Sequence, residues 1–189
     1  MRHHFYLLTR LFLLFLAGAA GQAHAQAALP DYTLHAGDQL AVNVWKEVDL
    51  VQTLVVRPDG KFSFPLAGEI QAVGRTVTQV QAEIETKLKK YIPEPVVTVT
   101  VTGIGGNVVY VIGQVGKPGA IVMNPQLMVL QALSLAGGTT PFAALNDIIV
   151  LRRVGGTQKV LPFKYSEVTR GRGLEQNIFL ESGDVVIVP

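Results

Sequence analysis

The sequence predicts an α+β fold made of two small units in series, and three observations point to it. Short runs rich in valine, isoleucine and threonine alternate with turns that contain glycine and proline, as strands and their connections do. Two other stretches carry apolar residues at steps of three and four, which indicates helices. A run of seven β-branched residues, 96–102, lies between a proline pair and a glycine cluster, so we place the end of the first unit there.

The N-terminal residues have the features of a secretory signal peptide. Arg2 and Arg10 flank a short N-terminal region, and every residue of the run that follows, 11–21, is apolar or small. Ala23-His24-Ala25 then fits the A-x-A cleavage pattern, and Ala25-Gln26-Ala27 is a second possible site. The apolar run is about half of the roughly 20 residues that a membrane span needs. We therefore expect residues 1–25 to be removed, with a retained membrane anchor as the alternative.

Composition limits the partners and the chemistry of the mature chain. Cleavage after Ala25 removes two arginines and three of the four histidines, which leaves 14 basic and 14 acidic residues. Balanced charge gives no reason to expect a nucleic-acid partner. The absence of cysteine excludes a disulfide framework and an acylated cysteine at the mature N-terminus. We expect a secreted protein that is not a lipoprotein.

The first unit begins with a strand that follows a tight turn. Leu40, Val42 and Val44 lie on one face of the predicted strand 39–45. Gly37 tolerates positive φ, and the Asp38 carboxylate can bond nearby backbone groups. Gly37-Asp38 is therefore predicted to start this strand.

A hairpin and a helix complete the predicted first unit. Arg57-Pro58-Asp59-Gly60 has the residue order of a type I β-turn and is predicted to join strands 54–56 and 62–64. Thr76 and Gln79 have the spacing of a capping box at the start of a helix. The helix is predicted to present one apolar face before Pro93 ends it: Val77, Val80, Ile84, Leu88 and Tyr91.

The strand 96–102 that follows is predicted to have two unlike faces. Its valines alternate with Thr98, Thr100 and Thr102, and successive side chains of a strand point to opposite faces. The valine face suits a core. The threonine face can meet water or a neighbouring subunit, so these three residues are candidate interface residues.

The second unit is predicted to be strand-rich with one short helix. Strands are expected at 108–112, 120–122, 148–151, 158–163 and 185–188, with a helix over 127–136 that ends at Gly137-Gly138. Gly155-Gly156 is a hairpin signal. Gly183-Asp184 repeats, before the last strand, the device seen at Gly37-Asp38.

No motif for catalysis or cofactor binding emerges. His35 is the only histidine after the leader, and without cysteine this removes Ser-His-Asp and Cys-His sites and zinc sites built on these residues. The glycine clusters at 103–106 and 113–119 lack the spacing and the following helix of phosphate-binding loops. We predict no cofactor and no metal. Arg152 and Arg153 are candidate contacts for an acidic glycan, against the simpler interpretation of a solvated face.

Taken in order, the motifs resemble a known family. Residues 32–45, 55–68, 74–84 and 91–99 are similar to the polysaccharide export domain of Wza-like outer-membrane export proteins, and 109–119, 130–138 and 180–189 resemble the SLBB (soluble-ligand-binding β-grasp) domain that follows it. The expected organisation is a signal peptide (1–25), an export domain (31–104) and a β-grasp-like SLBB domain (107–189). The family positions that match are turns: Gly37, Asp38, Pro58, Asp59, Gly60, Gly113, Pro118, Gly119, Gly137, Gly138, Gly183 and Asp184.

The resemblance implies a non-enzymatic part of a capsular or exopolysaccharide export machine. It implies a homo-oligomeric ring that passes the glycan without chemistry, together with an inner-membrane polysaccharide co-polymerase and polymerase. Longer members carry another SLBB copy and a C-terminal helix that lines the outer-membrane pore. This sequence stops at Pro189, so we expect a short ring, associated with the outer membrane, that depends on a separate channel.

Two other functions are kept as alternatives. One is a monomeric periplasmic glycan-binding module, which would differ from the ring in its molecular mass. The other is a carboxylate-based polysaccharide hydrolase or lyase, which would shorten its polymer. A pair of carboxylates suits glycoside hydrolysis, but Asp38, Asp59 and Asp184 each adjoin a turn glycine, which favours a backbone-bonding role.

Overall fold

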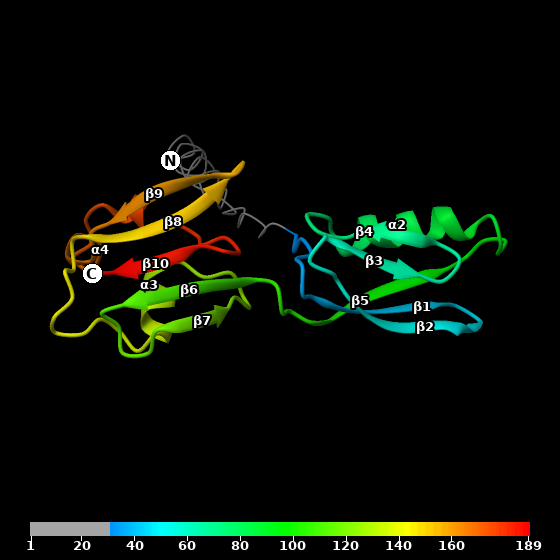
Figure 1. The fold of residues 1–189 in the computed structure, drawn as a ribbon, viewed down its shortest axis with the longest axis horizontal. Coiled ribbons are helices and arrows are strands. Elements are labelled where there is room, and N and C mark those ends of the chain that lie inside the picture. The colour runs from blue at the N-terminus through cyan, green and yellow to red at the C-terminus, as the bar shows by residue number, and fades with distance from the viewer. Residues whose placement is uncertain (1–30) are drawn as a thin grey trace, which may run out of the picture. The chain divides into compact units, whose positions relative to one another are not determined.

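The computed structural model describes residues 31–189, so the predicted signal peptide lies outside the described part. Three sheets and a few short helices confirm the predicted mixed α and β class (Figure 1). Two hydrophobic cores form, one from residues between Leu34 and Val99 and one from residues between Val109 and Val188. We call the two predicted ranges, 31–104 and 107–189, the first and the second domain.

The first domain contains a three-stranded antiparallel sheet in the order β2-β1-β5. Its strands are β1 (Gln39–Val44), β2 (Glu47–Val55) and β5 (Val97–Gly103). The predicted alternation of β5 is confirmed, because Val97 and Val99 are buried whereas all three threonines are exposed. β5 is an edge strand of this sheet.

The predicted hairpin between 54–56 and 62–64 is wrong. The turn at 57–60 forms, but β3 (Lys61–Phe64) pairs with β4 (Gly68–Gln71), and β2 pairs with β1. Phe62 and Phe64 lie in the core with Ile70 of the partner strand. Local turn chemistry therefore reverses the chain here, while core packing selects the strand pairs.

Helix α2 (Val77–Leu88) starts as predicted and ends earlier. The Gln79 amide N–H donates to Thr76 Oγ1 (3.3 Å), and the Thr76 N–H donates to Gln79 Oε1 (3.0 Å). Val80, Ile84 and Leu88 are buried. Tyr91 lies beyond the helix and is exposed, so its predicted place on the apolar face is wrong. The last turn ends at Leu88, ahead of Ile92, which is disfavoured in the α region because Pro93 follows it.

The turn between β1 and β2 presents apolar side chains to solvent. Trp45, the only tryptophan of the chain, is 69% exposed. Val48 is also exposed, and Lys46 takes a positive φ of 67° at the turn.

The second domain is built on a five-stranded sheet in the order β7-β6-β10-β8-β9. β10 runs parallel to β6, and the other neighbouring pairs are antiparallel. The two glycines of the β8–β9 turn, Gly155 and Gly156, have positive φ, as a tight hairpin turn requires. The strands are β6 (Val108–Gly113), β7 (Gly119–Val122), β8 (Ile148–Val154), β9 (Thr157–Phe163) and β10 (Val185–Val188).

Three short helical segments belong to the second domain. They are α3 (Val129–Leu135), α4 (Tyr165–Val168) and the 3₁₀ turn η1 (Leu174–Gln176), of which only α3 is predicted from sequence. α3 ends in a Schellman motif, in which the Gly138 N–H donates to the Leu133 carbonyl and the Gly137 N–H to that of Ser134. Within residues 31–189, no helix has the length and apolar character needed to cross a bilayer.

Candidate functional site

The repeated Gly-Asp device forms the same turn in both domains. In the first domain the His35 N–H donates to Asp38 Oδ2 (2.8 Å), and in the second the Glu181 N–H donates to Asp184 Oδ2 (2.9 Å). Gly37 and Gly183 have φ of 97° and 89°. Each aspartate is buried and bonds the backbone three residues upstream, just before its strand begins. The two carboxylates thus stabilise the turns that precede β1 and β10.

Asp38 accepts hydrogen bonds from a tyrosine hydroxyl and from backbone N–H groups. Tyr32 donates its hydroxyl to Asp38 Oδ2 (2.6 Å), and the Gly106 N–H donates to Oδ1 (3.0 Å). Burial and the neighbouring Asp38 carboxylate raise the pKa of Tyr32 above its ordinary value. His35 lies beside them, with Nδ1 3.3 Å from the Tyr32 hydroxyl. This cluster ties the start of β1 to the segment that follows β5.

Asp184 is instead bonded by an arginine of the neighbouring strand. Arg152 Nε donates to Asp184 Oδ1 (3.0 Å) and Nη2 to Oδ2 (2.6 Å), which is a bidentate pair. The same guanidinium donates to Glu181 Oε1 (2.6 Å) and to the Phe179 carbonyl (2.8 Å). Hydrogen bonds to Asp184 raise the pKa of Arg152. All of these contacts occupy Arg152 within its own domain.

The Pro58-Asp59-Gly60 turn lies at the surface of the first domain. The Gly60 N–H donates to the Arg57 carbonyl (2.9 Å), and Asp59 Oδ1 accepts from the Lys61 N–H (3.2 Å). The Arg57 guanidinium bonds both Asp59 and Glu69. Hydrogen bonds from Arg57 lower the pKa of both carboxyls. These residues reverse the chain and brace the β3–β4 hairpin.

The glycine motifs of the second domain meet one another. A Cβ on Gly113, whose φ is 94°, would lie 2.0 Å from the Val188 carbonyl oxygen, so only glycine fits there. The Gly116 N–H donates to the Gly138 carbonyl (3.0 Å), which brings the loop that contains Pro118 against the end of α3. Gly119 begins β7. Sequence reasoning missed this contact, because nothing local joins 113–119 to 137–138.

The outer face of the three-stranded sheet mixes hydroxyl and amide side chains with exposed valines. Thr100 lies opposite Ala41, which lies opposite Thr53, and Thr98 lies opposite Asn43. Thr102 is exposed on the same side of β5. The three predicted interface residues therefore form a row on an edge strand. Whether another subunit covers them stays a prediction.

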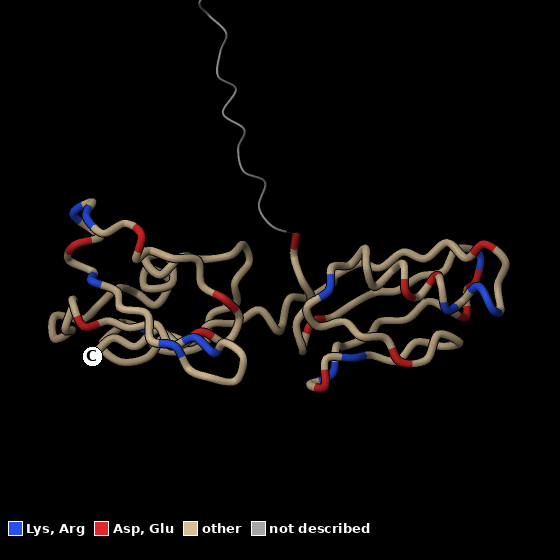
Figure 2. Tube along the Cα trace, turned by 90° about the horizontal axis from the view of Figure 1, so that it is seen from above, with Lys and Arg blue, Asp and Glu red and all other residues tan. Residues whose placement is uncertain are grey.

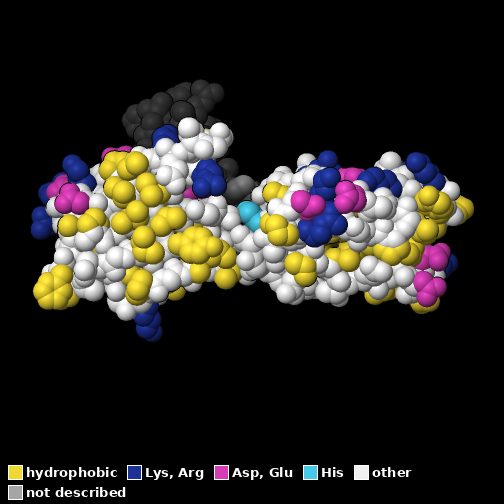
Figure 3. Space-filling model, viewed as in Figure 1, with side chains coloured by type: hydrophobic (Ala, Val, Ile, Leu, Met, Phe, Trp, Pro, Cys, Tyr) yellow, Lys and Arg dark blue, Asp and Glu magenta, His cyan; other side chains and the backbone are white. Residues whose placement is uncertain are grey.

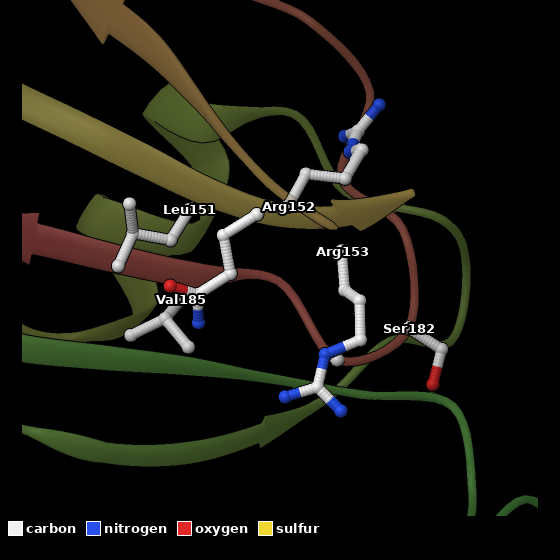
Figure 4. A pocket seen from close by; sticks show the side chains of 7 residues that line it. Leu151, Arg152, Arg153, Ser182 and Val185 are labelled. Atoms are coloured by element: carbon white, nitrogen blue, oxygen red, sulfur yellow. The ribbon is translucent and has the colours of Figure 1, made fainter. Parts of the chain in front are cut away.

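Arg153 borders a surface recess of the second domain. Figure 4 shows Arg152 and Arg153 extending from opposite sides of β8, as neighbouring residues of a strand do. The recess has a volume of about 450 Å³, and these residues line it: Leu151, Arg152, Arg153, Gln158, Ser182, Gly183 and Val185. Across residues 31–189, Arg153 has no carboxylate partner. A glycan contact by both arginines remains a prediction, and Arg153 is the one whose guanidinium is free of internal ion pairs.

The charged side chains form no cluster that suggests metal chemistry. Figure 2 shows lysine and arginine interspersed with aspartate and glutamate along the chain. In the described part, no group of three or more His, Asp or Glu residues is placed to hold a metal ion. Two of the aspartates considered for catalysis are buried in turns, and the third is exposed and paired with Arg57.

Comparisons with known proteins bear on both domains. Residues 26–102 match the sequence profile of the polysaccharide biosynthesis/export protein family, and residues 107–188 match that of the SLBB domain. Over 167 residues the chain is 32% identical to the EPS I polysaccharide export outer membrane protein EpsA of Ralstonia nicotianae, a match that covers 87% of this chain and 43% of that protein.

Two further relatives are similar over part of their length. The chain is 33% identical over 143 residues to the exopolysaccharide production protein ExoF of Rhizobium meliloti, covering 69% of this chain and 33% of ExoF. It is 29% identical over 161 residues to the polysialic acid transport protein KpsD of Escherichia coli, covering 84% of this chain and 28% of KpsD. The chain thus spans less than half the length of these curated relatives.

Proposed function

Since the chain belongs to the family of polysaccharide biosynthesis/export proteins, we propose that it is a non-enzymatic component of a machine that exports a capsular polysaccharide or exopolysaccharide. The observation that carries this proposal is the order of the two matched domains, export domain then SLBB domain, over almost all of residues 26–188. The names of EpsA, ExoF and KpsD, which concern export, production and transport of such polymers, support the same process.

The proposed mechanism is geometric. Subunits associate into a ring, and the glycan passes through it without bonds being made or broken. The turn roles of Asp38 and Asp184 support this mechanism, because both carboxylates are buried and bonded to the backbone rather than open to a substrate. The exposed hydroxyl and amide groups on the outer face of the three-stranded sheet support it too, since such groups are compatible with contact to a hydrated surface.

Deleting the gene tests the export role. We expect secreted polysaccharide to fall sharply, and a plasmid copy of the wild-type gene to restore it. Secretion at the full wild-type level in the deletion strain would refute the proposal. Fractionation of the envelope tests the proposed periplasmic, outer-membrane-associated location, and cross-linking tests contact with an inner-membrane co-polymerase and a separate outer-membrane channel.

The threonine row of β5 is the first proposed subunit interface. Thr98, Thr100 and Thr102 are exposed on an edge strand, so lysines there add three like charges without disturbing the core. We expect the triple lysine variant to stay folded and to lose oligomers in native mass spectrometry. A matched control puts lysine at three exposed threonines elsewhere: Thr86, Thr157 and Thr169. Equal oligomer mass in the two triple variants would reject this interface.

A monomeric glycan-binding module is the second candidate. The recess beside Arg153, with its amide, hydroxyl and guanidinium groups, favours it. Light scattering of the mature protein distinguishes the glycan-binding module from the export ring. A persistent monomer that binds oligosaccharide supports the module, and a defined oligomer supports the ring.

A further inference from the structure

The five-stranded sheet has an outer face that is apolar from edge to edge. One row crosses all five strands through directly paired residues: Ala120, Tyr110, Val185, Leu151 and Val160. A second row follows it: Ile112, Ile187, Ile149 and Pro162. We call these nine residues the outer apolar face. Figure 3 shows hydrophobic side chains gathered over the second domain.

This face is exposed and the opposite face is the core. Tyr110 and Val160 are 46% and 56% exposed, whereas Val109 and Val111 of the same sheet are fully buried on the other side. Antiparallel sheets with one solvated face normally alternate apolar and polar residues. A contiguous apolar patch on a soluble domain marks an interaction site.

A cation lies at one end of the outer apolar face. Arg153 lies two residues beyond Leu151 on the same side of β8, opposite Gln158 of β9. It borders the recess of about 450 Å³ and has no carboxylate partner among the described side chains. The face therefore suits a partner that is apolar and carries an acid.

The loop before β8 has both properties. Phe142 is 86% exposed, more than any other large apolar side chain of residues 31–189. The loop that carries it is held by the Thr140 N–H to the Gln114 carbonyl (3.0 Å) and the Ala144 N–H to the Pro189 carbonyl (2.7 Å). Asp147 ends this loop, is exposed, and forms no ion pair within the described part. A held loop presents an aromatic side chain at low entropic cost.

We propose that the loop of Phe142 and Asp147 docks on the outer apolar face of a second copy of this chain, with Asp147 directed to Arg153. Asp147 precedes β8, and Arg153 lies near the other end of this strand. Within one copy, about 20 Å of strand therefore separates Asp147 from Arg153, at about 3.3 Å per residue. The two patches are different surfaces, and their contact is head-to-tail. Such contacts form rings when the rotation closes. The inference rests on the proposed oligomeric function and names its second interface.

Two variants with complementary defects test the contact. Phe142→Ser removes the aromatic side chain of the loop and leaves the outer apolar face intact. Tyr110→Lys disrupts the outer apolar face and leaves the loop intact. We expect each variant alone to self-associate at least tenfold more weakly in sedimentation velocity, and their equimolar mixture to form a heterodimer. One intact copy of this contact joins each mixed pair, and neither end can extend the assembly through the same contact. Leu174→Ser removes another exposed apolar side chain of the same domain, 60% exposed, and should leave the oligomer unchanged.

A charge exchange tests the ionic part. Asp147→Arg and Arg153→Asp should each weaken the oligomer, and the two changes in one chain should restore it. Circular dichroism of every variant verifies folding.

Several results would overturn the proposal. An oligomer unaffected by both Phe142→Ser and Tyr110→Lys would reject this contact while leaving the export function intact, as would a mixture without heterodimer. Loss in Tyr110→Lys alone would indicate a symmetric face-to-face pair. A wild-type monomer that binds a uronic-acid oligosaccharide, with binding lost in Arg153→Ala, would assign the recess to glycan and would contradict the ring as well.

Discussion

Replacing Arg152 should destabilise the second domain far more than replacing its neighbour Arg153. The Arg152 side chain is 14% exposed, and that of Asp184, its bidentate partner, is 1% exposed. In Arg152→Met the buried carboxylate keeps only its bond from the Glu181 N–H. Removing one partner of a buried ion pair costs about 3–5 kcal/mol. Because Glu181 still donates to the carboxylate, we expect a loss near the lower limit, about 3 kcal/mol.

Arg153→Met is the matched control. Arg153 is exposed on the other side of the same strand and has no ion-pair partner among residues 31–189, so its replacement should change stability by less than about 0.5 kcal/mol. Adding Asp184→Asn to Arg152→Met removes the stranded charge and should recover part of the loss.

Hydrogen exchange followed by mass spectrometry suits the measurement, since a chain with two cores need not unfold in one transition. In Arg152→Met, amides of β8 and β10 should exchange about 100-fold faster, which corresponds to about 3 kcal/mol. Peptides from β1 and β5 serve as the internal reference. Equal exchange in the two methionine variants would refute the reasoning and would return Arg152 to the set of available glycan contacts.

Other perturbations are as specific. Gly113 and Gly155 both have positive φ, so an alanine at either position should cost about 1–2 kcal/mol in backbone strain. Only at Gly113 would the added Cβ also meet a carbonyl oxygen, at 2.0 Å. Urea unfolding should therefore show a larger loss of stability for Gly113→Ala than for Gly155→Ala, and equal losses would contradict this. Tyr32→Phe removes a donor to the buried Asp38 carboxylate and should cost about 1.5–3 kcal/mol, visible as a lower urea midpoint. Burial opposes ionisation of Glu83, but Lys87 and Arg75 outweigh it and lower the pKa of Glu83. Glu83→Gln should therefore cost up to about 1 kcal/mol at pH 7, and this difference should vanish as the pH falls below the ordinary glutamate pKa of about 4.3 and through the lowered folded value; a difference that persists at pH 2 would contradict the pKa shift.

Regular local patterns in the sequence predicted much of the fold. The alternation of valine and threonine predicted the two faces of β5, and the spacing of Thr76 and Gln79 predicted the capping box of α2. The structure has both features. Tyr91 shows the limit, since a helical spacing continues past the residue where the helix ends. The pairing of β3 with β4 shows another, because a turn fixes where the chain reverses but not which neighbouring strand the core accepts.

The candidate site was less predictable for a related reason. Arg152 and Arg153 look alike in the sequence, yet the period of two along β8 separates them: Arg152 shares the side of the buried Val150, and Arg153 that of Leu151 on the outer apolar face. The sequence therefore contained the signal that distinguishes the two arginines. No sequence signal predicted the contact of Gly116 with Gly138 or the exposed loop of Phe142, because both arise from backbone segments that only the folded chain brings together or displays.

The exposed Trp45 gives this protein an intrinsic reporter. Indole emission moves to shorter wavelength when water is excluded, and no other tryptophan contributes to the signal. Any partner or neighbouring subunit that covers the β1–β2 turn can therefore be detected by fluorescence in unlabelled protein. If emission stays at the wavelength of a hydrated indole while the chain assembles, that turn lies outside every contact, and its apolar residues are left for some other molecule.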